Sequence, residues 1–482
     1  MDLNKIGFNG LKWSSIGMIV RSLVQVIQIS ILTRFLSIEA FGLVAMALFV
    51  INFTNLIVEM GFTAAILNRQ QASDKELSSL FWFNLLIGFI LYLTIYLFSP
   101  IVSNFYKETE LKLIITILGS NIIFLTIGRV QRTILQKNFK FKKISIVDII
   151  SSFIGLVLAT VLAINNYGVY SIVYGTLISS VSSSFLFLIL KENKIYFQFR
   201  FDEIKPFFKV GSYSLLSSVL SFFTTDIDVL IIGKTLGPKS LGLYTLSKQI
   251  ILKVFSVINP IVTNVLSPLL SSIQNDKKKI KSSFLKVTSL LSYVNLPVYL
   301  LLLFFSKEIL LFLYGKEYVV ANFLLLSFVT IYFISSISNP VGSLQIATGR
   351  TDIGFKWAVI CMLIHPIIIY FASLINIDIL ALSRMFLFLI MILPLWFVQL
   401  KPMIKVTLKE YLLQFYKPLL FFILIFGGNY FYLSEIKFSE SLFISILIKL
   451  SIWLILILFY CYFFAKKDSI NLFNKLKLQL KR

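Results

Sequence analysis

The feature that most constrains this chain is a series of long apolar segments that recurs from one end to the other. Most are roughly 18 to 26 residues long, enough for a helix to cross a hydrocarbon core of about 30 Å. Backbone groups in lipid must be satisfied within the segment, and unbroken apolar runs exclude the short alternating segments of a β-barrel. We predict an all-α integral membrane protein with about fourteen transmembrane helices. The expected spans are 12–34, 40–65, 79–98, 112–130, 145–164, 168–190, 208–233, 241–271, 285–305, 320–347, 356–375, 378–400, 412–433 and 440–465.

The distribution of Lys and Arg predicts how these helices are oriented. The chain carries 45 such residues and a net charge of +23. With the N-terminus inside, and with residues near the ends of a span counted with the adjoining loop, 32 of them fall in cytoplasmic segments, 8 in outer segments and 5 within spans. Because basic residues accumulate in cytoplasmic loops, we expect both termini on the cytoplasmic side. The basic excess is then a topology signal, and no nucleic-acid partner is expected.

No residue pattern indicates catalysis or a bound cofactor. Cys361 and Cys461 both lie in apolar segments, so neither a disulfide nor a thiolate metal site is expected. The sequence contains no Walker loop, no metal-ligand cluster and no nucleophile–His–acid set. The first apolar segment lacks a small-residue cleavage site, so no cleavable signal peptide is expected.

The chain contains an internal repeat with an offset of 200 residues. Arg34–Leu43 and Lys234–Leu243 both read basic-x-Leu-x-x-x-x-apolar-Gly-Leu, and both lie in the short outer loop after a helix that starts from the cytoplasm. Two parallel lobes around a central cavity are a plan of transporters that work by alternating access. We predict pseudo-symmetric six-helix lobes at 1–196 and 208–400, a cytoplasmic linker at 197–207, two further helices within 401–465 and a basic cytoplasmic tail at 466–482. The tail fits either an amphipathic surface helix or a plain positive-inside tail.

Three segments carry a resemblance to a known family. Gln28–Met46 resembles the first-hairpin signature of bacterial polysaccharide repeat-unit flippases, the Wzx-type lipopolysaccharide and exopolysaccharide exporters. Asp226–Gly237, followed by Leu241–Tyr244, resembles the same signature in the second lobe. Ala347–Arg350 resembles the sequence at the end of the tenth helix in that family. The superfamily is that of the multidrug/oligosaccharidyl-lipid/polysaccharide exporters, which also holds lipid II flippases.

The resemblance implies a function in the bacterial inner membrane. Such proteins are not enzymes; they move undecaprenyl-pyrophosphate-linked oligosaccharide units from the inner to the outer leaflet for O-antigen, capsule or exopolysaccharide assembly. The implied partners are this cargo, membrane lipids, a coupling H⁺ or Na⁺, and a polysaccharide polymerase or glycosyltransferase complex. No cofactor is implied.

Ionisable groups within the spans are the candidate site residues, because burying them in lipid is costly. Arg21 lies about 13 Å from the cytoplasmic start of the first helix. Gln25 and Gln28 follow one and two turns later on the same face, so the three form a polar stripe. The stripe is expected to line the cavity, where the guanidinium would bind pyrophosphate or an acidic sugar. The alternative is a structural pair between Arg21 and an acidic residue.

A second group of charges lies on the seventh and eighth helices. Asp226 and Asp228 are two residues apart, so they cannot both face the cavity. They are interpreted either as a coupling-ion site or as partners of Lys248 or Lys253 on the next helix. Lys253, near mid-membrane, is the residue we expect to contact the cargo.

Four further ionisable residues lie within the spans. Arg384 either contributes to the cavity or extends its head group outward, and Glu59 is a candidate partner of Arg21. Lys449, outside the two lobes, is expected to pair or to mark a lateral surface. His365 precedes a proline, which favours a packed structural role over a proton relay.

Two other functions are compatible with the pattern. A cation-coupled multidrug extruder of the same superfamily would need an acidic cavity, whereas Arg21, Lys248, Lys253 and Arg384 favour an anionic cargo. A non-transporting scaffold of a glycan-assembly complex would have little use for charges buried at mid-membrane.

Overall fold

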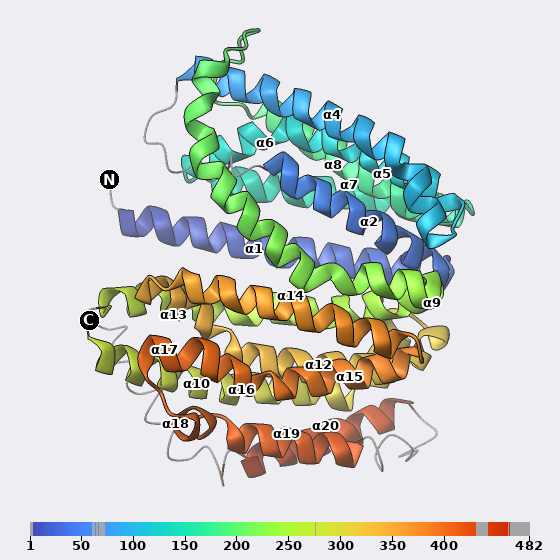
Figure 1. Ribbon diagram of the computed structural model, residues 1–482. Coiled ribbons are helices and arrows are strands. Elements are labelled where there is room, and N and C mark those ends of the chain that lie inside the picture. Colours follow the sequence, from blue (N-terminus) through green and yellow to red (C-terminus); the bar gives the residue numbers. More distant parts are fainter. Residues whose placement is uncertain are drawn as a thin grey trace. The chain divides into compact units, whose positions relative to one another are not determined.

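The structure, a computed structural model, describes residues 3–59, 63, 66, 73–274, 276–429, 442–460 and 462. Over these residues the elements are helices and no strand occurs, which confirms the all-α prediction (Figure 1). Ten helical stretches are long and apolar enough to cross a membrane. Two shorter apolar helices, Tyr416–Gly428 and Ile444–Tyr460, follow near the end of the described chain. The helices of the described residues do not confirm the expected count of fourteen transmembrane helices. Cys461 and the predicted tail at 466–482 lie outside the described residues.

The described chain divides into two compact units that do not follow a single cut in the sequence. The first unit is Met1–Leu246 with Ile364–Leu374, and the second is Ser247–Leu363 with Ile375–Arg482. The boundary therefore falls inside a helix rather than in the expected linker at 197–207. The predicted lobe bounds stay a prediction.

In the first unit, α7 (Phe141–Ile164) packs against two neighbouring helices. The helices of this unit are α1 (Leu3–Leu32), α2 (Ile38–Glu59), α4 (Asp74–Tyr106), α5 (Glu110–Gly119), α6 (Asn121–Lys137), α7 (Phe141–Ile164), α8 (Tyr170–Ile189), α9 (Phe201–Ser272) as far as Leu246, and the end of α14 (Thr351–Ser373) from Ile364. The helix α7 packs against both α1 and α8. At the α7–α8 crossing, a Cβ on Gly155 would lie 2.8 Å from the carbonyl oxygen of Gly175. Small residues at such crossings let helix backbones approach closely, as membrane helices require.

Two expected helices differ in detail from prediction. The helix expected at 79–98 begins at Asp74, because Ser73 and Glu76 form a reciprocal capping box that starts it earlier. The span expected at 112–130 is two helices, α5 and α6, which meet at Ser120.

The outer loop expected between 208–233 and 241–271 is reduced to a single break. The label α9 covers two helical arms, one in each expected span, which meet at a kink at Gly237; the φ of 76° and ψ of 179° of this residue suit a residue without a Cβ. Pro238 follows. Because proline has no backbone N–H, the break in the helical hydrogen bonds leaves no donor of this residue unsatisfied.

The second unit contains the remaining helices. They are the rest of α9 from Ser247, α10 (Lys277–Phe304), α11 (Ser306–Leu313), the 3₁₀-helix η1 (Lys316–Ala321), α12 (Asn322–Ser338), α13 (Pro340–Thr348), α14 (Thr351–Ser373) as far as Leu363, α15 (Ile377–Ile390), α16 (Ile392–Leu395), the π-helix η2 (Trp396–Leu400), α17 (Lys401–Ile404), α18 (Leu408–Leu412), α19 (Tyr416–Gly428) and α20 (Leu442–Tyr460). The helix α12 packs against α10 and α15. Phe333 of α12 stacks on Phe422 of α19 with ring centroids 4.6 Å apart, so α19 joins this core.

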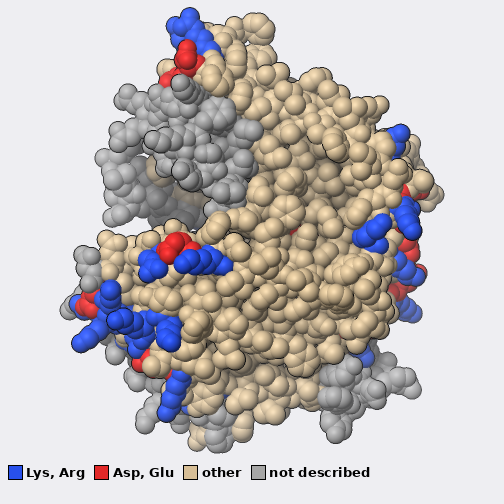
Figure 2. All heavy atoms as spheres, viewed as in Figure 1, with Lys and Arg blue, Asp and Glu red and all other residues tan. Residues whose placement is uncertain are grey.

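The surface has the charge distribution of a membrane protein. On the visible face, Lys, Arg, Asp and Glu gather near helix ends, and the helix flanks between them are formed by other residues (Figure 2). Many large apolar side chains on these flanks are exposed, among them Leu97 at 62% and Phe185 at 63%. Lipid is the solvent that makes such exposure favourable.

Candidate substrate and coupling residues

The two copies of the sequence repeat meet each other in the first unit. A Cβ on Gly42 would collide with the carbonyl oxygen of Pro238, and a Cβ on Gly242 would collide with the carbonyl oxygen of Ile38. Since Pro238 is Ile38 plus 200 and Gly242 is Gly42 plus 200, each repeat makes the same contact with the other. Such an exchange is what a two-fold relationship produces. We call these four residues the glycine interlock.

The contacts around the interlock join three helices at the same end of the first unit. Lys234 Nζ donates to the carbonyl oxygen of Phe105 and lies 4.6 Å from the centroid of the Phe105 ring. A Cβ on Gly233 would lie 2.9 Å from the Tyr106 ring and 3.1 Å from Met46. The end of α4, the start of α2 and the break in α9 are therefore packed together without space for larger side chains.

Asp228 is a buried carboxylate with a specific partner. Its side chain is 1% exposed, its Oδ2 accepts a 2.5 Å hydrogen bond from the Tyr244 hydroxyl, and its Oδ1 accepts from the Val229 N–H at 2.8 Å. Tyr244 is itself 1% exposed. The two residues lie on opposite arms of α9, so their hydrogen bond spans the break at Gly237. Tyr244 ends the second copy of the family signature, but nothing in its sequence pattern indicated that it would be the partner of Asp228.

The neighbouring acid has a different environment. Asp226 is half-buried and accepts a hydrogen bond from the Thr225 hydroxyl at 3.1 Å. The two carboxylates therefore differ in burial and in hydrogen-bond partner. His365, in the α14 segment of the first unit, lies within electrostatic reach of Asp228.

The polar stripe lies on α1. Arg21 is exposed, and Gln25 and Gln28 are half-buried. One turn before Arg21, Gly17 packs against α7 so closely that a Cβ would lie 2.5 Å from the Ser145 hydroxyl. The stripe therefore begins beside the α1–α7 contact. Glu59, the candidate partner of Arg21, ends α2, but its side chain lies outside the described residues.

The basic candidates of the second unit differ in burial. Lys248 is 9% exposed and Lys253 is half-buried, both on the second arm of α9. Arg384 of α15 is 8% exposed, and its guanidinium lies 5.9 Å from the centroid of the Phe328 ring. A guanidinium over an aromatic face is a cation–π contact, which a desolvated arginine favours.

Lys449 is confirmed as a paired residue. Its Nζ lies 2.5 Å from Glu308 Oε1, and the two side chains are 11% and 17% exposed. The pair joins α20 to α11 in the second unit. Sequence reasoning could not find the partner, because Glu308 lies in an expected outer loop 141 residues away.

A second ion pair was missed. Arg132 of α6 binds both carboxylate oxygens of Asp148 on α7, at 2.7 and 2.9 Å. The signal was present, since Asp148 is an acidic residue within the expected span 145–164. Bidentate geometry makes this the kind of pair that fixes two helices in register.

Ion pairs also hold the segments expected to be cytoplasmic. Glu192 accepts hydrogen bonds from Lys140 at 2.5 Å and Lys143 at 3.2 Å. Burial alone would raise the pKa of Glu192, but the hydrogen bonds from Lys140, Asn138 and Lys143 outweigh it and lower the pKa. Lys281 lies 2.7 Å from Glu410, and this hydrogen bond lowers the pKa of Glu410 to about 2.

The described part of the chain contains no group of three His, Cys, Asp or Glu side chains placed to hold a metal ion. Its single described cysteine, Cys361, is buried and forms no disulfide.

Comparison with known proteins identifies the family. The family described as "Polysaccharide biosynthesis protein" matches residues 31–322, more than half of the chain. The chain belongs to this family. Relatives include the teichuronic acid biosynthesis protein TuaB of Bacillus subtilis (strain 168), 27% identical over 74% of this chain and 74% of that protein. The lipopolysaccharide biosynthesis protein WzxC of Escherichia coli (strain K12) is 25% identical over 87% of this chain and 86% of its own.

A solved structure shows the same fold. The lipid II flippase MurJ, in an inward closed conformation, matches with a TM-score of 0.73 and 21% identity, over 93% of this chain and 98% of that protein. Together with the ten membrane-length helices, this likeness establishes a multi-pass membrane protein with a transporter fold.

Proposed function

We propose that this protein flips undecaprenyl-pyrophosphate-linked oligosaccharide units from the cytoplasmic to the outer leaflet of the bacterial inner membrane. The observation that carries the proposal is the family match over residues 31–322. The fold shared with a lipid flippase supports it, because a lipid-linked sugar needs a protein path only for its polar head. On this proposal the protein is a transporter of the multidrug/oligosaccharidyl-lipid/polysaccharide exporter superfamily and not an enzyme. Its fourteen helices form two lobes and an added helix pair, with both termini cytoplasmic.

The basic groups in the spans are proposed to receive the pyrophosphate. Arg21, Lys253 and Arg384 provide cationic groups, and Gln25 and Gln28 add hydrogen-bond donors for sugar hydroxyls. Guanidinium groups suit this role because their planar donors bind phosphate oxygens in pairs. The proposed cavity carries positive charge, which a transporter of cationic drugs would avoid.

The glycine interlock is proposed to be the outer gate. Both copies of its signature follow a helix that starts from the cytoplasm, so the positive-inside pattern puts the interlock at the outer surface. With backbone against backbone at this end, the cargo would enter from the cytoplasmic side. Separation of Gly42 from Pro238, and of Gly242 from Ile38, would then open the path outward.

Asp228 is proposed to be the coupling group. A buried carboxylate that accepts from Tyr244 and lies near His365 can exchange a proton as the α9 arms move. Pairing of Asp226 or Asp228 with Lys248 or Lys253 stays the structural alternative. A partnership with the polymerase or glycosyltransferases of the same glycan is proposed on the family match alone.

A lipid analysis tests the proposal. A deletion strain is complemented with wild type, with Arg21→Ala, and with Lys112→Ala as a matched control at an exposed basic residue of the same unit. Lipid-linked oligosaccharide is extracted and quantified by mass spectrometry. We expect accumulation in the deletion strain, relief by wild type and by Lys112→Ala, and loss of most of that relief with Arg21→Ala. Unchanged lipid-linked oligosaccharide in the deletion strain, with altered drug sensitivity, would point to an extruder instead.

A further inference from the structure

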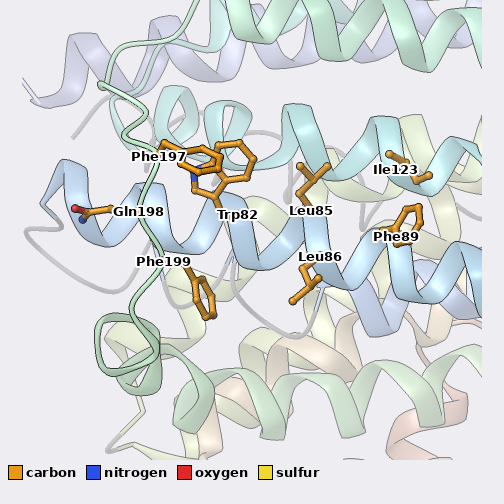
Figure 3. Close-up of a pocket in the computed structure, with 8 residues that line it drawn as sticks. All are labelled: Trp82, Leu85, Leu86, Phe89, Ile123, Phe197, Gln198 and Phe199. Carbon is orange, nitrogen blue, oxygen red and sulfur yellow. The ribbon is translucent and has the colours of Figure 1, made fainter.

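An apolar groove of about 560 Å³ runs along the surface of the first unit (Figure 3). Its walls include Trp82, Leu85, Leu86 and Phe89 of α4, and Phe197 and Phe199 of the segment that follows α8. The volume lies within the range of about 300–1,000 Å³ that is usual for ligand pockets. The candidate substrate residues are not among its walls, so the groove is separate from the proposed cargo path.

The wall formed by the segment after α8 is held to α4 by hydrogen bonds. The Ser78 hydroxyl accepts from the N–H of Tyr196 at 3.0 Å, and the Ser79 hydroxyl accepts from the N–H of Arg200 at 3.3 Å. The indole N–H of Trp82 donates to the carbonyl oxygen of Tyr196 at 2.8 Å. These three hydrogen bonds hold the segment in place against α4, although it belongs to no helix.

The aromatic rings of this segment are exposed and directed along α4. Phe197 is 91% exposed and meets Trp82 edge-on, with centroids 4.9 Å apart. Phe199 stacks on Phe83 at 6.2 Å. In the close-up, Phe197 and Phe199 project toward the side of Leu85 and Leu86 (Figure 3). Such rings between a polar chain and an apolar helix flank are typical of the membrane interface.

The segment also carries polar and basic residues. Gln198 projects away from the two phenylalanine rings (Figure 3), and its Nε2 is buried with no hydrogen-bond acceptor among the described residues. Lys194 and Arg200 flank it and are exposed. The groove extends from this end to Phe89, seven residues beyond Trp82 and therefore about 10 Å along the helix. It is polar where the basic linker begins and apolar where α4 enters the predicted span 79–98.

We propose that the groove binds one anionic phospholipid of the cytoplasmic leaflet. An acyl chain lies along Leu85, Leu86 and Phe89, and the phosphate lies against Lys194 and Arg200. Charge complementarity selects this occupant, because anionic lipid is attracted to juxtamembrane basic residues and each contributes about a fivefold gain in affinity. The lipid would fasten the segment 190–200 to α4 at the point where the first repeat leads into the second.

Native mass spectrometry of the full-length protein in detergent tests this proposal. The protein is titrated with phosphatidylglycerol, phosphatidylcholine and undecaprenyl phosphate. We expect one phosphatidylglycerol to bind at least tenfold more tightly than phosphatidylcholine. Leu86→Trp, which fills the groove, and Lys194→Ala combined with Arg200→Ala should each weaken phosphatidylglycerol binding by about tenfold or more.

Matched controls come from surfaces of the same kind elsewhere. Phe153→Trp changes an apolar side chain of α7 that is 56% exposed, and Lys277→Ala with Lys278→Ala removes two exposed lysines of the second unit. Both controls should keep the wild-type affinity. Thermal unfolding without added lipid shows whether each variant is folded, and Phe197→Ala replaces Leu86→Trp if the latter does not fold.

Three results would overturn the proposal. They are equal binding of the two phospholipids, unchanged binding by the folded groove variants, or tight binding of undecaprenyl phosphate with none of phosphatidylglycerol. The last result would assign the groove to the cargo tail. Lipid binding and transport are separable readouts, because Arg21→Ala should impair transport while leaving phosphatidylglycerol binding intact.

Discussion

The carbonyl oxygen of Pro238 occupies the space that a Cβ on Gly42 would need. The equivalent residues 200 positions apart, Ile38 and Gly242, make the reciprocal contact. A backbone-to-backbone contact of this kind excludes even a methyl group. The glycines of the repeated signature are thus explained by packing between the two copies, in addition to any freedom that glycine gives each loop.

Gly42→Ala and Gly242→Ala should each disrupt the interlock. Overpacking of this kind costs about 1–3 kcal/mol, so thermal unfolding in detergent should shift to lower temperature and transport should fall. Gly342→Ala is the matched control, because a Cβ on Gly342 has no neighbour within 4 Å. In that helical position, alanine should be neutral or slightly stabilising. Equal unfolding temperatures for Gly42→Ala and Gly342→Ala would contradict the interlock.

Tyr244→Phe should lower the free energy of unfolding, because it removes the hydrogen bond that joins the two arms of α9. Removing the hydroxyl leaves the buried carboxylate of Asp228 without this hydrogen bond, at a cost of about 1–3 kcal/mol. Tyr167→Phe, at a tyrosine that is 54% exposed, should change stability by far less. A double-mutant cycle with Asp228→Asn measures the interaction between the two side chains. A coupling energy near zero would show that the hydrogen bond contributes nothing.

Breaking the pair of Lys449 and Glu308 should be strongly destabilising. Lys449→Met leaves a carboxylate buried without its cation, which typically costs about 3–5 kcal/mol. Combining it with Glu308→Gln should restore much of the loss, because no uncompensated charge remains. Lys279→Met is the control, since its pair with Asp276 is exposed and such pairs contribute about 0–1 kcal/mol. If Lys449→Met lowered the unfolding temperature no more than Lys279→Met does, the prediction would be refuted.

The ion pair of Lys281 and Glu410 should make stability depend on acid pH. The folded-state pKa of Glu410 is lowered to about 2, so its contribution is fully present above the ordinary glutamate pKa of 4.5. It is lost as the pH falls from about 5 toward 2. Glu410→Gln should therefore lower the unfolding temperature at pH 7, and the difference from wild type should shrink over that window. A difference independent of pH would contradict a contribution from the charge of the Glu410 carboxylate.

Composition and periodicity were sufficient to predict the class of protein. Apolar segments of bilayer length require helices, whatever packs around them, because the backbone has no other hydrogen-bond partner in lipid. The repeat could also be found from sequence, since Gly42 and Gly242 keep the same position in the same signature. The sequence also indicated that Lys449 needs a partner, because the free-energy cost of burying a charged side chain in lipid does not depend on the fold.

Tertiary structure alone decided which residues meet. The pairing of Lys449 with Glu308, of Arg132 with Asp148 and of Asp228 with Tyr244 depends on helix crossings that hydropathy does not encode. The start of α4 at Asp74 and the single break at Gly237 came from a cap and one backbone conformation, to which an apolar window is insensitive. The groove beside Trp82 arises because the segment after α8 folds back on α4, 114 residues earlier. The sequence by itself determined that the chain must be helical and membrane-bound, since solvation acts on each segment separately; contacts between distant segments were decided by packing, which acts on pairs.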